Sequence, residues 1–166
     1  MKKVTRGLSH AITIFIMINE KKRININNIL ERAIDIGQRM LVTGAEVSRV
    51  ERTIKFICRA YGVRHVDVMV ITSSIIVTIR GNDIGVLTQM RRVPGQSFDF
   101  QRLKALNQLS REICEHPVSS EEIKLRIHAI DTMDAISLKE TVFYWALIAA
   151  SFCAFFGGSL EDAVCA

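Results

Sequence analysis

The stretch VDVMVITSSIIVTIRGNDIGVLTQMRRVPG, residues 66–95, decides the fold class of this chain. Side chains alternate between apolar and polar over 66–70, and the β-branched run 75–79 follows a Thr-Ser-Ser turn. A third candidate strand, 86–93, follows a Gly-Asn-Asp turn and is closed by a Pro-Gly pair. Short turns join consecutive strands in antiparallel pairs, so we predict a three-stranded antiparallel sheet.

Helical patterns lie on both sides of these strands. Apolar residues over 28–60 recur with helical spacing and predict one long amphipathic helix, with a break near Gly37 or Gly44 left open. A second helix is predicted over 99–115. Ser119 and Glu122 form a capping box, in which each side chain bonds the other's backbone N–H, and predict the start of a third helix. The predicted fold is therefore an α+β head in which helices pack around a small sheet.

A run without a charged residue occupies 141–160, between Glu140 and Glu161. A bilayer-spanning helix needs about 20 apolar residues, so this run predicts one transmembrane helix. The predicted division is a poorly defined leader at 1–27, a head domain at 28–138, and the first transmembrane helix with a truncated remainder at 139–166. Because the sequence ends at Ala166, we expect the helix to pack against another chain or against further sequence.

Two stripes of small residues lie along this predicted helix. Ala146, Ala150, Ala154 and Gly158 form one, and Ala149, Cys153 and Gly157 form the other. Small side chains let a second membrane helix approach closely, which favours a helix-packing face. The other interpretation is that alanine is simply common in membrane helices.

The charge balance indicates where the head lies. The chain has 22 basic and 17 acidic residues, a net charge of +5 that is spread along the sequence, so we predict no nucleic-acid partner. Lys124, Arg126 and Lys139 precede the apolar run, while Glu161 and Asp162 follow it. By the positive-inside rule, the head is predicted to face the cytoplasm.

The cysteines and histidines predict neither a metal site nor a catalytic site. The cysteines, at 58, 114, 153 and 165, form no C-x-x-C pair and have no histidine at metal-ligand spacing, so we predict no metal, cofactor or disulfide framework. His65 and Asp67 share a face of the first predicted strand. No nucleophile motif accompanies them, so an ordinary strand-face pair is the preferred interpretation.

The segment GAEVSRVE, residues 44–51, holds the densest cluster of candidate functional side chains. With 100° per helical residue, Glu46 and Glu51 fall at the margins of the buried arc, and Arg49 stands one turn from Glu46. The opposite, solvated face is predicted to carry Ser48, Arg52, Lys55 and Arg59. Two interpretations stay open: Glu46 and Arg49 pair locally and fix the helix to the sheet, or these groups gate or contact a polar substrate.

With these residues identified, the chain resembles the N-terminal part of the threonine/serine exporter family. The resemblance begins near residue 29 and reaches the C-terminus. The segments that carry it are Gly44-Ala45-Glu46, Ser48-Arg49-Val50-Glu51, Tyr61-Gly62, the β-branched hairpin, Arg92-Val93, and Phe156-Gly157-Gly158 followed by Asp162.

The resemblance implies an exporter of the inner membrane, in which a cytoplasmic head precedes a set of membrane spans. Further spans would come from the same chain or from a multi-span partner subunit, which implies an oligomer, and this chain resembles a member truncated after its first span. The implied substrates are small hydroxy amino acids or, in split systems, a dicarboxylate such as succinate. The substrate or gating residues that it implies are Glu46, Arg49, Glu51 and Asp162.

Two alternative functions stay open at this point. One is a membrane-anchored assembly or regulatory module that binds partner helices through the small residues Ala146, Ala150, Ala154, Gly157 and Gly158. The other is a hydrolase-like domain with Glu46 or Glu51 as general base.

Overall fold

The computed structural model describes residues 2–82, 84–95, 97–133 and 138–157, with backbone alone for 2–16 and 138. It divides into two compact units, 1–132 and 133–166. The elements are α1 (Lys2–Val42), α2 (Val47–Ala60), β1 (His65–Ile71), β2 (Ser74–Gly81), β3 (Gly85–Arg92), α3 (Phe100–Glu115), α4 (Ser120–Asp131) and α5 (Leu138–Phe155).

The three strands form the predicted antiparallel sheet, in the order β1-β2-β3. In their register, Val68 lies opposite Val77 and Val77 opposite Gln89. Alternate residues of the first two strands, including Val66, Val70 and Ile75, face the core. The α+β class is therefore confirmed, and the strand order follows the chain.

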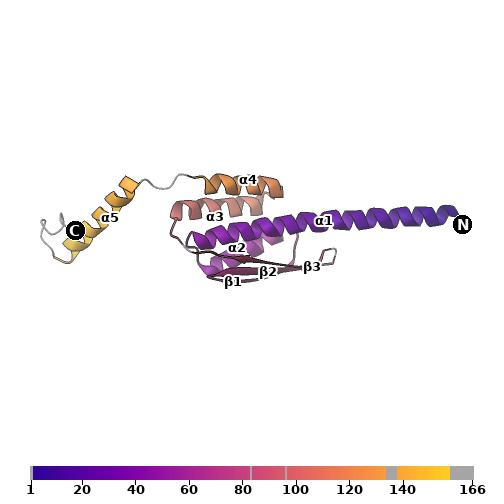
Figure 1. Ribbon diagram of the computed structural model, residues 1–166, viewed down its shortest axis with the longest axis horizontal. Coiled ribbons are helices and arrows are strands. Elements are labelled where there is room, and N and C mark those ends of the chain that lie inside the picture. The colour runs from indigo at the N-terminus through magenta and orange to yellow at the C-terminus, as the bar shows by residue number, and fades with distance from the viewer. Residues whose placement is uncertain (1, 83, 96, 134–137, 158–166) are drawn as a thin grey trace. The chain divides into compact units, whose positions relative to one another are not determined.

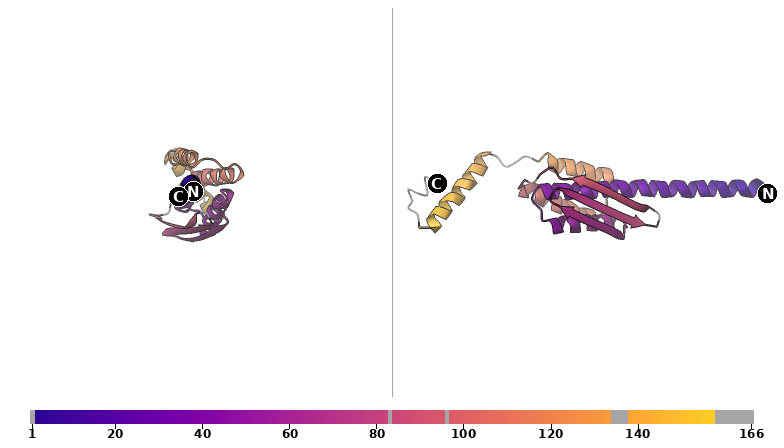
Figure 2. Two further views of the ribbon diagram at one scale, coloured as in Figure 1. Left: turned by 90° about the vertical axis from the view of Figure 1, so that its right-hand side faces the viewer. Right: turned by 60° about the horizontal axis from the view of Figure 1, so that its bottom comes forward.

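Helices cover one face of this sheet (Figures 1 and 2). The second half of α1 and the apolar face of α2 lie against the strands, and α3 and α4 pack on the side of these helices away from the sheet. The side chains at the centre of this arrangement are fully buried and include Leu30, Ile34, Met40, Ile54 and Ile79. One hydrophobic core thus joins the sheet to all four helices of the first unit.

The predicted long helix is two helices, and the break lies at Gly44. Gly44 has a positive φ of 97°, and the bonds from its N–H to the Leu41 carbonyl and from Ala45 N–H to the Met40 carbonyl form a Schellman motif. At Gly37 the helix continues. A Cβ there would lie 2.6 Å from Ile54 Cδ1, so this glycine serves the close packing of α1 on α2.

One of the two hydrogen bonds of the predicted capping box is present at the start of α4. Ser119 Oγ accepts a hydrogen bond from the Glu122 N–H at 3.2 Å, as predicted. The Glu122 carboxylate accepts instead from the Arg126 guanidinium one turn later. Because that guanidinium is a stronger, charged donor, the predicted return bond from Glu122 to Ser119 is absent among the described hydrogen bonds.

The second unit contributes α5, which covers most of the predicted transmembrane run. The helix ends at Phe155, and Gly157 follows in a left-handed conformation, with φ of 81°. Within the described residues, none of the helices combines the length and the apolarity that crossing a membrane requires. The predicted transmembrane helix is therefore not confirmed, and its last residues, 158–160, lie outside the described part of the chain.

Candidate functional site

The three predicted charged residues of the head have different surroundings. Glu46 is exposed, and its Oε1 accepts a hydrogen bond from Ser48 Oγ at 2.7 Å. Arg49 is also exposed, and no ion pair joins it to Glu46 among the described residues. Glu51 is half-buried, and its Oε1 accepts from the Val70 N–H at 3.0 Å. Partial burial is thus correct for Glu51 and wrong for Glu46.

The helix break explains this difference. The prediction placed Glu46 on a continuous helix, whereas Glu46 precedes α2 with an extended backbone, φ −66° and ψ 139°. Helical spacing therefore does not apply to its side chain. Glu51 lies within α2 and reaches β1, so it fixes this helix to the sheet, the role that the sequence left open for Glu46 and Arg49.

Glu46 and Arg49 line a groove of about 880 Å³ between α2 and α3. This α2–α3 groove is bounded by Glu46, Arg49, Arg52, Thr53, Phe56, Arg59, Ala60, Asn107, Ser110, Arg111, Cys114 and Glu115. The lining contains four arginines and two glutamates, so it carries an excess of positive charge. Arg52 and Arg59, predicted to be merely solvated, thus form one wall of a concave surface with a second helix opposite.

The arginines of this groove are exposed and their guanidinium groups have no partner among the described residues, as is also true of Arg64 and Arg92 outside it. The guanidinium groups of Arg49, Arg52, Arg59 and Arg111 take part in none of the hydrogen bonds or ion pairs of the described residues. By contrast, six arginines elsewhere in the head pair with carboxylates: Arg32, Arg39, Arg80, Arg91, Arg102 and Arg126. Charged donors thus remain available to a ligand in the groove.

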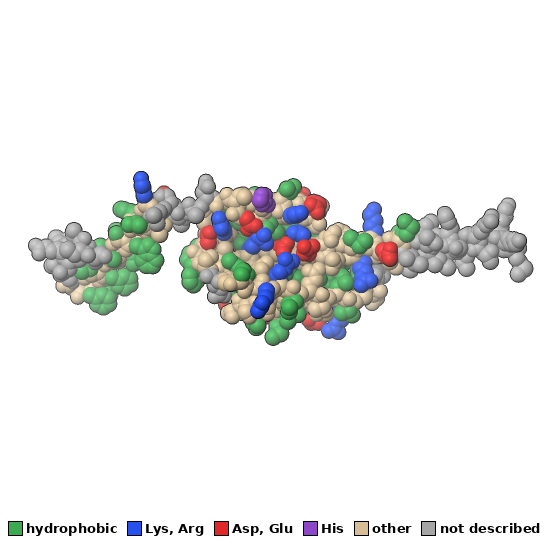
Figure 3. Space-filling view, viewed as in Figure 1, with side chains coloured by type: hydrophobic (Ala, Val, Ile, Leu, Met, Phe, Trp, Pro, Cys, Tyr) green, Lys and Arg blue, Asp and Glu red, His purple; other side chains and the backbone are tan. Residues whose placement is uncertain are grey.

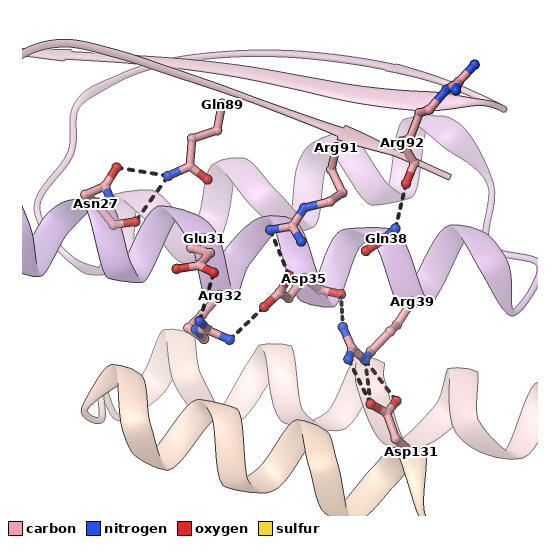
Figure 4. Close-up of polar contacts among 10 residues, drawn as sticks. All are labelled: Asn27, Glu31, Arg32, Asp35, Gln38, Arg39, Gln89, Arg91, Arg92 and Asp131. Carbon is pink, nitrogen blue, oxygen red and sulfur yellow. Dashed lines mark hydrogen bonds and ion pairs between the residues drawn. The ribbon is translucent and has the colours of Figure 1, made fainter. Parts of the chain in front are cut away.

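A second polar cluster lies where α1 meets β3 and α4 (Figure 4). Asp35 is 8% exposed, although it belongs to the apolar segment of α1. Its carboxylate lies 2.8 Å from Arg32 Nη1 on the same helix and 3.2 Å from Arg91 Nη2 on β3. Two guanidinium groups therefore neutralise this buried charge, as burial of a carboxylate requires.

Hydrogen bonds join the same face of α1 to both neighbouring elements, α4 and β3. Arg39 donates from Nε to both carboxylate oxygens of Asp131 at 2.9 Å, and from Nη2 to Asp131 Oδ2 at 2.8 Å. The hydrogen bond with Asp131 raises the pKa of Arg39. Gln38 Nε2 donates to the Arg92 carbonyl at 2.6 Å. Acidic and basic side chains are interspersed over this face of the head (Figure 3), and we assign the cluster a structural role.

The sequence pattern did not predict this cluster. The available signal was Asp35 itself, a carboxylate between Ile34 and Ile36 in an amphipathic helix. Its partner Arg91 lies far away in sequence, and sequence pattern does not show which strand packs on which helix.

The comparison with known protein families decides the family. The family model described as "Putative threonine/serine exporter" matches residues 31–166, most of the chain. The chain belongs to this family. Neither the curated proteins nor the solved structures contain a match. The resemblance drawn from Glu46, Arg49 and Glu51 is thus confirmed at the level of the family, and all three residues lie within the matched range.

The remaining predicted sites of this exporter-family chain lie on and after α5. Ala146, Ala150 and Ala154 follow one another at one-turn spacing on α5, and Gly157 lies just beyond its end. Gly158 and Asp162 are outside the described residues. Asp67 pairs with Arg80 across the strands at 3.0 Å, so the strand-face interpretation of Asp67 holds. No hydrogen bond or ion pair joins Asp67 to His65 among the described residues.

Proposed function

We propose that this chain is a subunit or part of an inner-membrane exporter of small hydroxy amino acids, threonine or serine, or of a related small acid. The family match over residues 31–166 carries this proposal. A family of exporters indicates transport rather than catalysis.

The substrate or gating residues of this proposal are Glu46 and Arg49 at the α2–α3 groove, Glu51 further along α2, and Asp162, which lies outside the described residues. An amino acid carries both charges, so recognition needs a carboxylate for its ammonium group and a guanidinium for its carboxylate. Glu46 and Arg49 supply both signs on adjacent, exposed positions of one wall. Glu51 acts as a positioning residue, because its carboxylate is bound to the β1 backbone.

The membrane part of the proposal rests on residues 141–160. The described side chains of α5 beyond Glu140 are mostly apolar, and large ones such as Trp145, Phe152 and Phe155 are exposed by 60 to 82%. A helix that is apolar on all sides needs an apolar environment around it. We infer that lipid and the spans of a multi-span partner, or of further sequence, provide it, with Ala146, Ala150 and Ala154 as the packing face. By the positive-inside rule, this proposal places the head in the cytoplasm.

The test is threonine and serine efflux from cells that express the Glu46→Gln variant. We expect efflux to fall at least about tenfold, because a neutral amide replaces the charged partner of the ammonium group. Glu121→Gln is the matched control, since Glu121 is an exposed glutamate of α4 outside the groove. Protein abundance in the membrane fraction is measured in parallel. Unchanged efflux at equal abundance would remove Glu46 from the transport mechanism and favour the assembly-module interpretation.

A further inference from the structure

We propose that the α2–α3 groove binds a nucleoside polyphosphate, such as ATP or ADP, through Arg52, Arg59 and Arg111. This ligand is distinct from the exported amino acid. The groove provides three features that such a ligand needs: unpaired guanidinium groups from two helices, an exposed aromatic ring in the same lining, and sufficient volume.

The charge of the groove favours an anion, because its four arginines outnumber Glu46 and Glu115. Arg52 and Arg59 come from α2, and Arg111 comes from α3 on the opposite side. None of the three guanidinium groups has a partner among the described residues, and all three line one concave surface, unlike the exposed Arg64 and Arg92 outside it. Arginine binds phosphate oxygens with two parallel hydrogen bonds, so three arginines in the lining of one groove suit a polyphosphate chain.

The uncharged polar side chains of the groove donate hydrogen bonds within their own helices, so the arginines are the main donors for a ligand. Thr53 Oγ1 donates to the Arg49 carbonyl at 2.9 Å, and Ser110 Oγ donates to the Asn107 carbonyl at 2.8 Å. The Asn107 amide donates to the Leu103 carbonyl at 2.8 Å. These donors serve their own helices, so the guanidinium groups are the donors that remain for a ligand.

An aromatic ring in the groove favours a nucleoside over an inorganic polyphosphate. Phe56 lines the groove among the arginines and is 51% exposed. Stacking of a base on an aromatic side chain contributes about 1–3 kcal/mol. A half-exposed phenylalanine on a basic wall therefore offers a platform for the base while the arginines hold the phosphates.

The size of the groove agrees with this ligand. Its volume of about 880 Å³ falls within the range of roughly 300–1,000 Å³ that drug-sized ligands occupy. A single small amino acid held at Glu46 and Arg49 would leave most of this space open. A neighbouring hollow along α3 adds Lys104 and shares Arg49 and Arg111 with the groove, so the positive surface extends further.

The experiment is calorimetric titration of the full chain, purified in detergent, with ATP, ADP and inorganic tripolyphosphate. We expect saturable binding of ATP and ADP that weakens as salt increases. The double variant Arg52→Ala/Arg111→Ala should weaken nucleotide binding at least about tenfold. The matched control is Arg64→Ala/Arg92→Ala, which removes two exposed arginines outside the groove and should change the affinity less than about twofold.

A second variant tests the nucleoside part. Phe56→Ala should weaken ATP binding and leave tripolyphosphate binding unchanged, because only the base stacks on the ring. Equal loss in both ATP and tripolyphosphate would overturn the assignment of Phe56. Thermal melting of each variant, expected to match the unaltered chain for these exposed side chains, separates loss of a contact from loss of the fold.

Three outcomes overturn the proposal as a whole. They are the absence of saturable nucleotide binding, equal weakening by the groove variant and its control, and binding of phosphatidylglycerol vesicles through these arginines without any nucleotide binding. The titration needs no transport, so it can fail while the efflux test succeeds, and the reverse. The two proposals are therefore tested separately.

Discussion

At the scale of single residues, burial determines the chemistry of Cys58. Its thiol lies in the core at the end of α2, is 1% exposed, and has a pKa raised by burial to about 12. An accessible cysteine has a pKa near 9.0 and reacts as the thiolate. In the folded chain Cys58 therefore stays protonated at pH values where an unfolded chain would ionise it.

This shift predicts both the reactivity and the pH dependence of Cys58. Because the folded pKa is raised, the folded state keeps the proton, so the stability contribution is complete below pH 9.0 and is lost as pH rises toward about 12. Alkylation by iodoacetamide at pH 9.0, followed by mass spectrometry, should leave Cys58 unmodified in the native chain and modify it in urea. Equal labelling in both states would contradict the burial of this thiol.

Residue-level predictions from the sequence succeeded where the backbone was regular. Glu51 lies inside α2, and helical spacing placed it correctly at the edge of the buried arc. Glu46 lies just outside that helix, so the same spacing predicted a burial that the residue lacks. Arg111 was not predicted as a site residue at all, because its role depends on α3 lying beside α2, which periodicity does not show.

At the scale of elements, Gly44 separates α1 from α2. Its φ of 97° is costly for any residue with a Cβ, and an added Cβ would lie 2.9 Å from Phe98 Cδ1. Gly44→Ala should therefore lower the free energy of unfolding by about 1–3 kcal/mol, measured by urea denaturation. Gly95→Ala is the control, because nothing lies within 4 Å of a Cβ at Gly95. Equal stability of the two variants would contradict the role of Gly44.

The sequence predicted the elements well and their breaks poorly. Alternation over 66–70 and the turns at 72–74 and 81–83 predicted all three strands, because each signal is local. The capping serine at Ser119 predicted the start of α4 for the same reason. Two glycines in one amphipathic pattern gave no local reason to choose between them, and only the packing of Gly37 on Ile54 explains why the helix continues there.

At the scale of the whole molecule, Asp35 joins α1, β3 and, through its neighbour Arg39, α4. Its carboxylate lies between the guanidinium groups of Arg32 and Arg91. Asp35→Asn should lower the free energy of unfolding by about 1.5–3 kcal/mol, the range for hydrogen bonds to charged groups, because Arg91 loses its counter-ion and Arg32 keeps only Glu31. Chemical denaturation of the full chain measures this loss.

The control for Asp35 is Asp67→Asn on the sheet surface. Asp67 also pairs with an arginine, but both side chains of that pair are more than 60% exposed. Exposed ion pairs contribute about 0–1 kcal/mol, so this variant should be nearly as stable as the unaltered chain. If Asp35→Asn were as mild as Asp67→Asn, the cluster around α1 would not hold the head together.

We propose that this family member takes part in the export of small hydroxy amino acids. The most direct measurement is threonine and serine efflux from cells in which the open reading frame is disrupted and then restored, with and without a co-expressed multi-span partner. We predict that disruption lowers efflux and that the restored chain, together with its membrane partner, recovers it. Efflux that is unchanged by disruption and by restoration would contradict a role of this chain in export.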